Sequence, residues 1–382
     1  MYDDATECPS YDGSREALRV GYVFNSPEII GGGEFSFIDL LDAIRQVEVK
    51  PVALVPGPGE VKTRLQSLGV DVELIRLQPL RSRSLLSLPR RRTQLAGLFK
   101  YLRLDLIHAN GARCMLYAGP AARRAGIPCV WHVRVLERDR LLDRIRAQYA
   151  SCVVANSRAT AAAIQPFVPT STSLEVVYNG IRLDGFTSAP PADLKGDLGA
   201  TETPVVLGVG RFTKWKAFED LIRACAILKE QGLRFSCILV GEALPSERGY
   251  EIELKRLAQD LRLTNVFFAG WRNDVASIMK SSSVLVLPSH GEPFGRVMIE
   301  AWACGLPVVA TNAGGPAELI RHGIDGLLVP VDAPERLSDA ITYLLEDSSL
   351  SNRLTAAAAE RTAKFSLEKH VEHMLRIYRA LL

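Results

Sequence analysis

Short apolar runs alternate with longer segments of helical periodicity in the first part of the chain. The runs at 18–24, 51–55 and 70–75 are rich in valine and leucine, as expected for strands that are buried on both faces. The segments 35–44 and 60–68, which lie between them, have the spacing of amphipathic helices. Alternation of strands and helices predicts a parallel sheet whose faces are covered by helices.

The same alternation continues to the end of the chain. A stretch at 187–203, rich in alanine, proline, glycine and aspartate, interrupts it and predicts a linker. A chain of 382 residues is also longer than one hydrophobic core usually supports. We therefore expect two doubly wound α/β domains, 17–186 and 204–365, and a final helix at 366–382. Further strands are predicted at 105–110, 128–133, 151–156, 174–186 (with a turn), 205–209, 235–240, 264–268, 284–287 and 306–310, and further helices at 113–125, 247–260, 273–280, 333–347 and 350–364.

Composition and charge describe an ordinary globular protein. Hydrophobic residues make up 47% and charged residues 23% of the chain, and the net charge of +3 is too small to indicate a nucleic-acid partner. The seven cysteines are scattered and form no C-x-x-C pair, which predicts buried thiols in a reducing compartment. Residues 1–16 are polar, lack a signal-peptide core and predict a disordered lead, and no apolar run has the length of a membrane span. We therefore expect a cytoplasmic protein.

A basic segment at 76–103 departs from this pattern, because its leucines are interleaved with seven arginines and one lysine. A solvated basic helix explains the segment at least as well as any functional interpretation. The alternative is a peripheral contact with an anionic membrane surface, where each basic residue adds on the order of 1 kcal/mol.

The most informative stretch is 289–318, SHGEPFGRVMIEAWACGLPVVATNAGGPAE. It predicts a loop, a helix with Pro293 in its first turn, a buried strand, a glycine turn and a second helix that ends near Gly323. Glu292 belongs to the loop, and Glu300 lies in the first helix, off its apolar face. The free N–H groups at the start of that helix suit a phosphate, and Gly295 allows a ligand to approach the backbone. An isolated pair of carboxylates at this spacing is nevertheless better explained by the helix dipole and by solvation.

Three further candidates lie at predicted strand ends, where open α/β sheets bind ligands. Gly32 and Gly33 follow the first strand, and they allow either close approach of the backbone to a phosphate or sugar, or simply a flexible turn. His132 lies at the tip of the strand 128–133, although a lone histidine is more often structural. Arg211 and Lys216 follow the strand 205–209 and would clamp a diphosphate.

Several other chemistries find no support in the sequence. The glycines around Arg211 lack the third glycine of a dinucleotide fingerprint. The chain contains no D-x-D and no His/Cys/Asp cluster with metal-ligand spacing, so we expect no metal.

The run GEPFGRVMIEAWACGLPVVAT, followed by GGPAELI and GIDGLLVP, closely resembles the donor-site signature of retaining glycosyltransferases of family 4. The G-G-x-E type of loop, VVYNGIRLDGF and GRFTKWK extend the resemblance over nearly the whole chain, with Ala217 in place of a glycine and Val135 in place of an acidic residue. The resemblance implies the GT-B architecture, two Rossmann-like domains that face each other across a cleft. It also implies that the terminal helix crosses back to the first domain.

The resemblance further implies a nucleoside diphosphate sugar, UDP- or GDP-linked, as co-substrate, with no other cofactor, and a sugar or lipid-linked acceptor. In such a site Glu300 would hold the ribose, Arg211 and Lys216 the diphosphate, and Glu292 the hydroxyls of the donor sugar. His132 would contact the sugar from the opposite domain. The backbone amide of Gly295 would assist at the diphosphate, and the loop at Gly32 and Gly33 would contact the diphosphate and the acceptor.

Two other functions are compatible with the same motifs and site residues. A non-hydrolysing nucleotide-sugar epimerase of the same architecture would turn over the donor without an acceptor. A non-catalytic protein that binds a sugar nucleotide would show binding without transfer. Fold-level analogy alone does not decide among the three.

Overall fold

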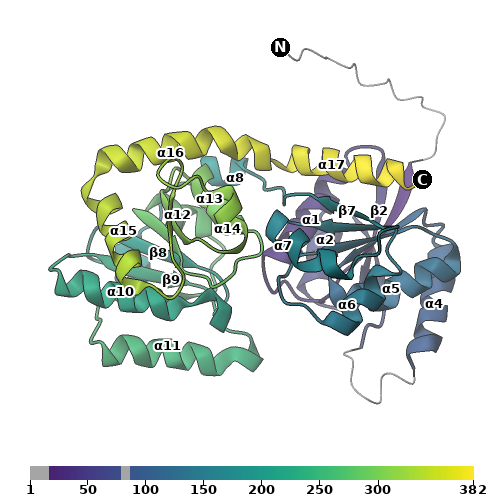
Figure 1. The fold of residues 1–382 in the computed structure, drawn as a ribbon, viewed down its shortest axis with the longest axis horizontal. Coiled ribbons are helices and arrows are strands. Elements are labelled where there is room, and N and C mark those ends of the chain that lie inside the picture. Colours follow the sequence, from purple (N-terminus) through teal and green to yellow (C-terminus); the bar gives the residue numbers. More distant parts are fainter. Residues whose placement is uncertain (1–16, 79–86) are drawn as a thin grey trace, which may run out of the picture.

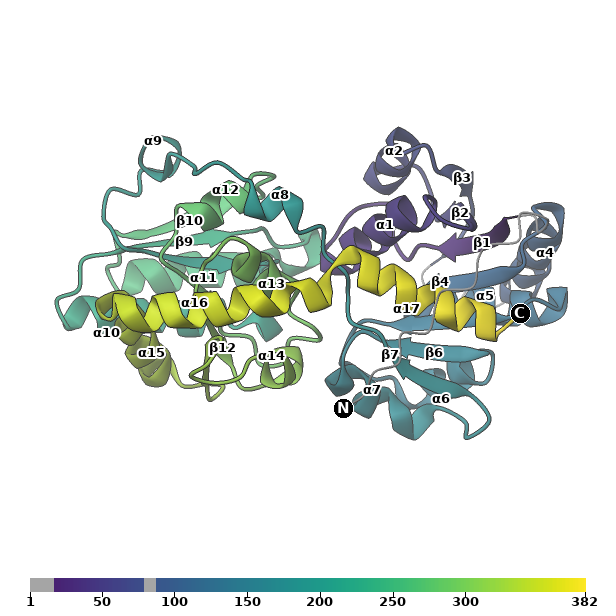
Figure 2. The same cartoon turned by 90° about the horizontal axis from the view of Figure 1, so that it is seen from above.

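The computed structural model describes residues 17–78 and 87–382. It contains two parallel sheets, each in a domain of its own, with helices packed on the sheet faces (Figure 1 and Figure 2). The predicted lead at 1–16 and the part of the basic segment at 79–86 lie outside the described residues.

The first domain is built on a seven-stranded sheet in the order β3-β2-β1-β4-β5-β6-β7. All its strand pairs are parallel, as the alternation of strands and helices predicts. Its strands are β1 (Leu18–Val23), β2 (Val49–Val55), β3 (Asp71–Leu74), β4 (Leu106–Asn110), β5 (Cys129–Val133), β6 (Cys152–Ala155) and β7 (Ser173–Val176). Its helices are α1 (Gly32–Ile44), α2 (Glu60–Ser67), α4 (Leu88–Tyr101), α5 (Ala112–Ala125), α6 (Arg140–Ala147), α7 (Arg158–Ile164) and the 3-10 turn η1 (Gln165–Phe167).

The second domain is built on a six-stranded parallel sheet in the order β10-β9-β8-β11-β12-β13. Its strands are β8 (Val205–Val209), β9 (Ser236–Val240), β10 (Val266–Gly270), β11 (Val284–Leu287), β12 (Val308–Thr311) and β13 (Leu327–Val329). Its helical elements are α8 (Asp184–Thr187), α9 (Leu194–Leu198), η2 (Lys214–Lys216), α10 (Phe218–Glu230), η3 (Pro245–Glu247), α11 (Arg248–Asp260), α12 (Val275–Lys280), α13 (Arg296–Ala303), α14 (Gly314–Leu319), α15 (Pro334–Glu346), α16 (Ser348–Thr362) and η4 (Ala363–Phe365).

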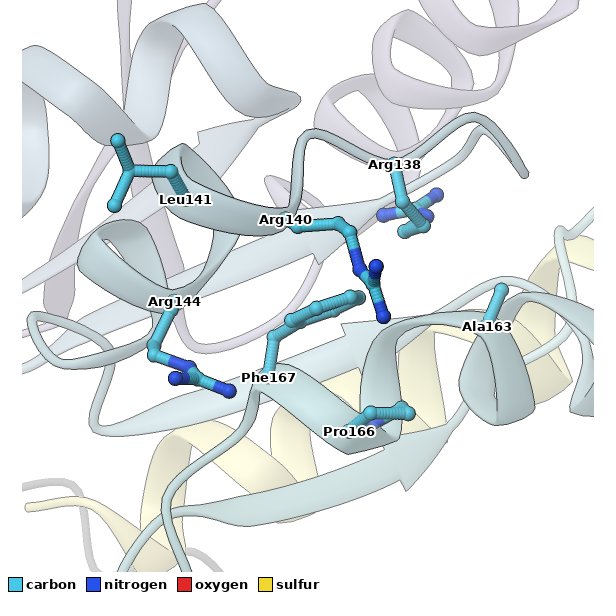
Figure 3. Close-up of a pocket in the computed structure, with 7 residues that line it drawn as sticks. All are labelled: Arg138, Arg140, Leu141, Arg144, Ala163, Pro166 and Phe167. Carbon is cyan, nitrogen blue, oxygen red and sulfur yellow. The ribbon is translucent and has the colours of Figure 1, made fainter.

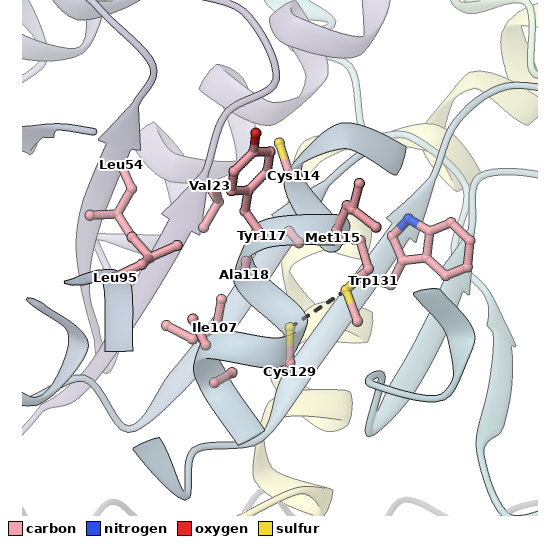
Figure 4. Packing of buried hydrophobic residues seen from close by; sticks show 14 of the residues in the cluster. Val23, Leu54, Leu95, Ile107, Cys114, Met115, Tyr117, Ala118, Cys129 and Trp131 are labelled. Carbon is pink, nitrogen blue, oxygen red and sulfur yellow. Dashed lines mark hydrogen bonds between the residues drawn. The ribbon is translucent and has the colours of Figure 1, made fainter. Parts of the chain in front are cut away.

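Apolar residues of the central strands alternate between the two faces of the first sheet, because successive strand residues point to opposite sides. Val23 and Trp131 belong to a core on one face that also contains Met115 from α5 (Figure 4). Val20 belongs to a second core on the other face, together with residues of α1 and α2. The thiol of Cys129 lies 3.8 Å from the sulfur of Met115 inside the first core.

The six cysteines in the described part of the chain are all free and buried.

The last helix, α17 (Leu367–Ala380), lies on the first domain although it follows the second domain in the sequence. Figure 1 shows α16 running over the second domain and α17 continuing over the first. Met374 and Tyr378 of α17 are fully buried in the core that α1 and α2 share with the sheet. The chain thus closes the core of its first domain with its last helix.

Several predicted helix ends differ from the observed ones, each for a local reason. Helix α13 begins at Arg296 and not at Pro293, because Gly295 has a left-handed φ of 87° and helical geometry starts only after it. Helix α14 ends at Leu319 and not near Gly323, because Ile320 is extended. Helix α1 begins at Gly32, three residues earlier than predicted, so Gly32 and Gly33 form its first turn.

The stretch 187–203 includes the short helix α9, and the buried Leu194 of this helix packs into a core of the second domain. Among the residues that the structure describes, no helix combines the length and the hydropathy that a bilayer span requires.

Candidate functional site

The predicted site residues lie at or beyond the carboxyl ends of strands on both sheets. In the first sheet the strand order reverses between β1 and β4, and in the second between β8 and β11. Such reversal points are where open α/β sheets place ligands. The loop with Gly32 and Gly33 follows β1, and His132 lies in β5. Arg211 and Lys216 follow β8, and Glu292 follows β11.

Lys216 and Glu292 form an ion pair across the end of the second sheet. Each side chain is only 11% exposed, and the ammonium also lies 4.7 Å from the centre of the Trp215 ring. An ammonium has three N–H donors and a carboxylate has two oxygens, so the pair keeps two donors and one oxygen for further partners. The structure therefore brings together a cation and an acid that are 76 residues apart in the sequence.

Backbone contacts hold the loop of Glu292 in place. The carbonyl oxygen of Glu292 accepts a hydrogen bond of 2.7 Å from the amide of Gly315. A Cβ atom at Gly314, where φ is 62°, would overlap that same oxygen, so only glycine fits. The glycine turn after β12 thus positions Glu292, a role that the sequence did not indicate for it.

Arg211 has a different acidic partner from Lys216. Its Nε lies 3.5 Å from Oε2 of Glu247, which is an ion-pair distance longer than a hydrogen bond. Glu247 also accepts a hydrogen bond from the Thr213 hydroxyl. The two cations that the sequence singles out are therefore each balanced by a separate carboxylate.

Glu300 is bound to Arg296, a residue to which the sequence analysis assigned no role. Nε of Arg296 donates to Glu300 over 2.7 Å, while Nη2 donates to Asp39 over 2.8 Å and Nη1 to the Ser36 hydroxyl over 3.1 Å. Burial by itself would lower the pKa of Arg296, but Glu300 and Asp39 outweigh it and the pKa is raised. Because Ser36 and Asp39 belong to α1, this guanidinium joins the two domains.

His132 is fully buried and belongs to a polar group that includes His108 and Tyr378. Nε2 of His108 lies 3.0 Å from Nδ1 of His132, and Nδ1 of His108 lies 2.5 Å from the Tyr378 hydroxyl. Burial lowers the pKa of both histidines well below the ordinary value, and the nearby Arg134 adds to the effect. Both rings are therefore neutral at physiological pH.

Glu34 and Arg134 also belong to this region, although no sequence motif indicated a role for either. Glu34 is 8% exposed, and burial raises its pKa, an effect that the charges of Arg134 and Arg211 oppose. A Cβ at Gly33 would lie 3.6 Å from Cδ of Arg134, and one at Gly32 would lie 3.8 Å from Cδ of Arg296. Glu34 directly follows a run of glycines at the start of a helix. This position in the sequence could have indicated a role for its carboxylate.

Comparison with known proteins agrees with this geometry. Residues 193–361 match the family described as Glycosyl transferases group 1, and residues 30–184 match Glycosyltransferase Family 4. The crystal structure of HepE from Anabaena in complex with UDP and glucose has 28% sequence identity and a TM-score of 0.85, over 95% of this chain and 100% of that one. The chain belongs to the group 1 glycosyltransferases. Its fold is GT-B, as its two Rossmann-like sheets and its structural neighbours show.

Curated relatives match over shorter regions than HepE does. The lipopolysaccharide core biosynthesis glycosyltransferase LpsE of Rhizobium meliloti is 36% identical over 178 residues, which are 46% of this chain and 50% of that protein. The D-inositol 3-phosphate glycosyltransferase of Thermobifida fusca is 28% identical over 300 residues, 72% of this chain and 69% of the relative. This group 1 glycosyltransferase thus spans about half of LpsE and about two thirds of the second relative.

Two further features lie outside this group of residues. The side chains of Asp220, His290 and Asp332 bring their ligand atoms within 4.8 Å of one another, a grouping that no sequence spacing indicated. His290 already forms an ion pair of 2.8 Å with Asp332, and both are exposed, so an ion pair accounts for the contact.

A pocket of about 730 Å³ lies between α6 and η1, away from the predicted site residues (Figure 3). Its walls carry the side chains of Arg138, Arg140 and Arg144 around Phe167. None of the residues that line it belongs to the charged pairs at the strand ends.

The buried histidines predict a loss of stability in mild acid. Burial lowers the pKa of His370 to about 3, and those of His108 and His132 are also lowered, so unfolding adds protons to all three below the ordinary pKa of ~6.5. The unfolding free energy should therefore fall as pH drops through this window, by up to about 1.4 kcal/mol per pH unit for each histidine. Urea unfolding followed by circular dichroism between about pH 7 and 5.5 measures the slope.

His370→Gln should remove the contribution of one proton from that slope, which is about 1.4 kcal/mol per pH unit. His373→Gln, at an exposed position on the same helix, is the matched control, and His370→Gln should reduce the slope more than this variant does. An equal slope in wild type and in His370→Gln would contradict the assignment of His370 as a buried neutral group.

Proposed function

We propose that this protein transfers a sugar from a nucleoside diphosphate sugar, UDP- or GDP-linked, to an acceptor hydroxyl with retention of anomeric configuration. The observation that carries the proposal is the meeting of Lys216 with Glu292, and of Arg296 with Glu300, at the carboxyl ends of the second sheet. The structures of HepE, a protein solved with UDP and glucose and with UDP-glucose, support it at 27–28% identity over the whole length of that chain.

The second domain would hold the donor. Glu300 gives one carboxylate oxygen to Arg296, and the other is left to accept hydrogen bonds from the ribose hydroxyls. Arg211 and Lys216 would contact the diphosphate and stabilise the negative charge that grows as the leaving group departs. Gly295 would bring its backbone close to the phosphates, and Glu292 would hold hydroxyls of the donor sugar.

The first domain would complete the site. His132 would contact the donor sugar, and the turn with Gly32 and Gly33 would contact the diphosphate and the acceptor. The leaving phosphate would take the proton of the acceptor hydroxyl, so that the reaction needs no metal and no separate general base. Contact between the domains would exclude water and suppress hydrolysis of the donor.

The acceptor would be a bacterial polysaccharide or glycolipid that is built at the inner face of the cell membrane. LpsE acts in lipopolysaccharide core biosynthesis, as its name states, and this supports the class of acceptor. The protein itself would be cytoplasmic, with a peripheral membrane contact through the described part of 76–103.

A transfer assay with UDP-, GDP-, ADP- and CMP-linked sugars tests the function. We expect one donor of the UDP or GDP class to be consumed only when an acceptor glycan is present, with retained configuration in the product by NMR. Conversion of the donor with no acceptor would favour an epimerase instead. Nucleotide binding without transfer over a broad acceptor panel would favour a non-catalytic protein.

Substitutions separate binding from catalysis. Glu300→Ala should weaken UDP binding in calorimetry by about 10- to 100-fold, since it removes charged hydrogen bonds to the ribose. Lys216→Ala should lower kcat by about 100-fold or more while it changes nucleotide affinity by less than about tenfold. Glu360→Ala and Lys214→Ala, both at exposed positions of the second domain, are the controls. Wild-type activity in Glu300→Ala and Lys216→Ala would exclude this site.

The membrane contact is tested by co-sedimentation with anionic and zwitterionic vesicles. Arg90, Lys100 and Arg103 are exposed at or next to α4 and should bind the anionic vesicles in a salt-sensitive manner. Replacing all three by glutamine should abolish binding, whereas Arg336→Gln with Arg353→Gln on the second domain should not. Binding that is absent, or insensitive to salt, would contradict the contact.

A further inference from the structure

A chain of buried polar groups leads from the last helix to His132. The Tyr378 hydroxyl contacts Nδ1 of His108 over 2.5 Å, and Nε2 of His108 contacts Nδ1 of His132 over 3.0 Å. Tyr378 and both histidines are fully buried. A neutral imidazole has one N–H and one bare nitrogen, so each contact in the chain has a definite donor and a definite acceptor.

Arg134 fixes the direction of these hydrogen bonds. Its Nη2 lies 3.2 Å from Nδ1 of His132, while its Nε donates to the Asn110 side chain over 2.6 Å and its Nη1 donates to that of Asn179. A guanidinium only donates, so Nδ1 of His132 is the acceptor and the ring carries its proton on Nε2. By the same reasoning Nε2 of His108 donates to His132, and Nδ1 of His108 accepts from the hydroxyl of Tyr378.

We propose that Tyr378 and His108 are positioning residues that hold His132 in its Nε2–H tautomer, so that His132 offers a hydrogen-bond donor to an oxygen of the donor sugar. The second part of this proposal rests on the proposed function. Nε2 of His132 is buried and has no hydrogen-bond partner among the described residues, so the protein itself does not use this donor. A sugar hydroxyl or ring oxygen is the kind of group that accepts from it.

The surroundings keep the rings of His108 and His132 neutral and the guanidinium of Arg134 charged. Burial, with a contribution from Arg134, lowers the pKa of His108 and of His132, so both rings are neutral and their tautomers matter. Burial also lowers the pKa of Arg134, to about 9, which leaves it protonated at neutral pH. A protonated His132 would donate from both nitrogens and would need no Tyr378 to set its state.

The proposal gives α17 a role in the chemistry of the first domain. Tyr378 lies 270 residues from His108 in the sequence, and its helix follows the whole of the second domain. In Tyr378→Phe the Nδ1 of His108 loses its donor, and the proton of that ring can move to Nδ1. Nε2 of His108 then becomes an acceptor and competes with the Arg134 guanidinium for Nδ1 of His132, so part of the His132 population carries its proton on Nδ1.

Nitrogen NMR of protein labelled with ¹⁵N-histidine tests the tautomer without any substrate. The chain has six histidines, so single substitutions assign the signals. We expect a protonated Nε2 and a bare Nδ1 for His132 in the wild type, and a shift toward the opposite tautomer in Tyr378→Phe. Tyr343→Phe, at a position 63% exposed on α15, should change nothing. A wild-type His132 that is protonated at Nδ1, or one unaffected by Tyr378→Phe, would overturn the proposal.

Kinetics test the consequence for the reaction. Tyr378→Phe should lower kcat by about fivefold to tenfold with little change in UDP affinity, as expected for one weakened hydrogen bond to the sugar. His108→Gln keeps an amide N–H toward His132 and should retain more activity than His108→Leu. Equal activity in these two variants would indicate a merely structural role for His108.

The two readouts separate this proposal from the function on which it rests. If no donor is transferred by the wild type, the proposed function fails, whereas the NMR result still decides the tautomer. If Tyr378→Phe does not fold, the wild-type spectrum and the pair of His108 variants remain decisive.

Discussion

The structure depends on one guanidinium that both domains share. Arg296 begins α13 in the second domain, donates to Glu300 on its own helix, and also donates to Asp39 and Ser36 on α1 of the first domain. Its side chain is only 13% exposed, and an unpaired charge at such a position would cost several kcal/mol. The hydrogen bonds of Arg296 to Asp39 and Ser36 therefore contribute to holding the two domains in this arrangement. The carboxylate that we expect to bind ribose is oriented by the same residue that joins the domains.

The same need to pair buried charge organises the rest of the site. Lys216 is balanced by Glu292, and Glu292 is in turn held by backbone contacts with the glycine turn at Gly314. Arg134 is held by two asparagine side chains and by His132. Each charged group thus has a neighbour that orients it, which is the condition for electrostatic stabilisation of a transition state.

The last helix, α17, connects the second domain to the core of the first domain. It leaves the second domain after α16 and closes the core of the first domain with Met374 and Tyr378. Its docking therefore depends on how the domains lie relative to each other. The polar chain through His108 makes the same helix a neighbour of His132, so a group 1 glycosyltransferase of this kind ties the state of its first-domain histidine to its most C-terminal element.

The sequence alone determined the order of buried strands and amphipathic helices, because continuous apolar runs and a period of 3.6 residues are local properties of the chain. The GT-B arrangement was implied by the resemblance to a known family. Arg211, Lys216 and Glu292 stood out because they lie next to predicted strand and helix ends. Glu300 lies inside a helix, and its expected role came from the family resemblance. Helix boundaries were less accurate, as at α13, where the start depends on the left-handed backbone of Gly295.

Only the tertiary structure decided how the side chains are partnered. Arg296 and Asp39 are 257 residues apart, and Tyr378 and His108 are 270 apart, so no periodicity relates them. Their contacts exist because the first residue of α13 reaches α1 and because α17 packs into the core of the first domain. Burial in the folded protein also shifted pKa values, because the desolvation that raises the pKa of Glu34 is absent from the unfolded chain.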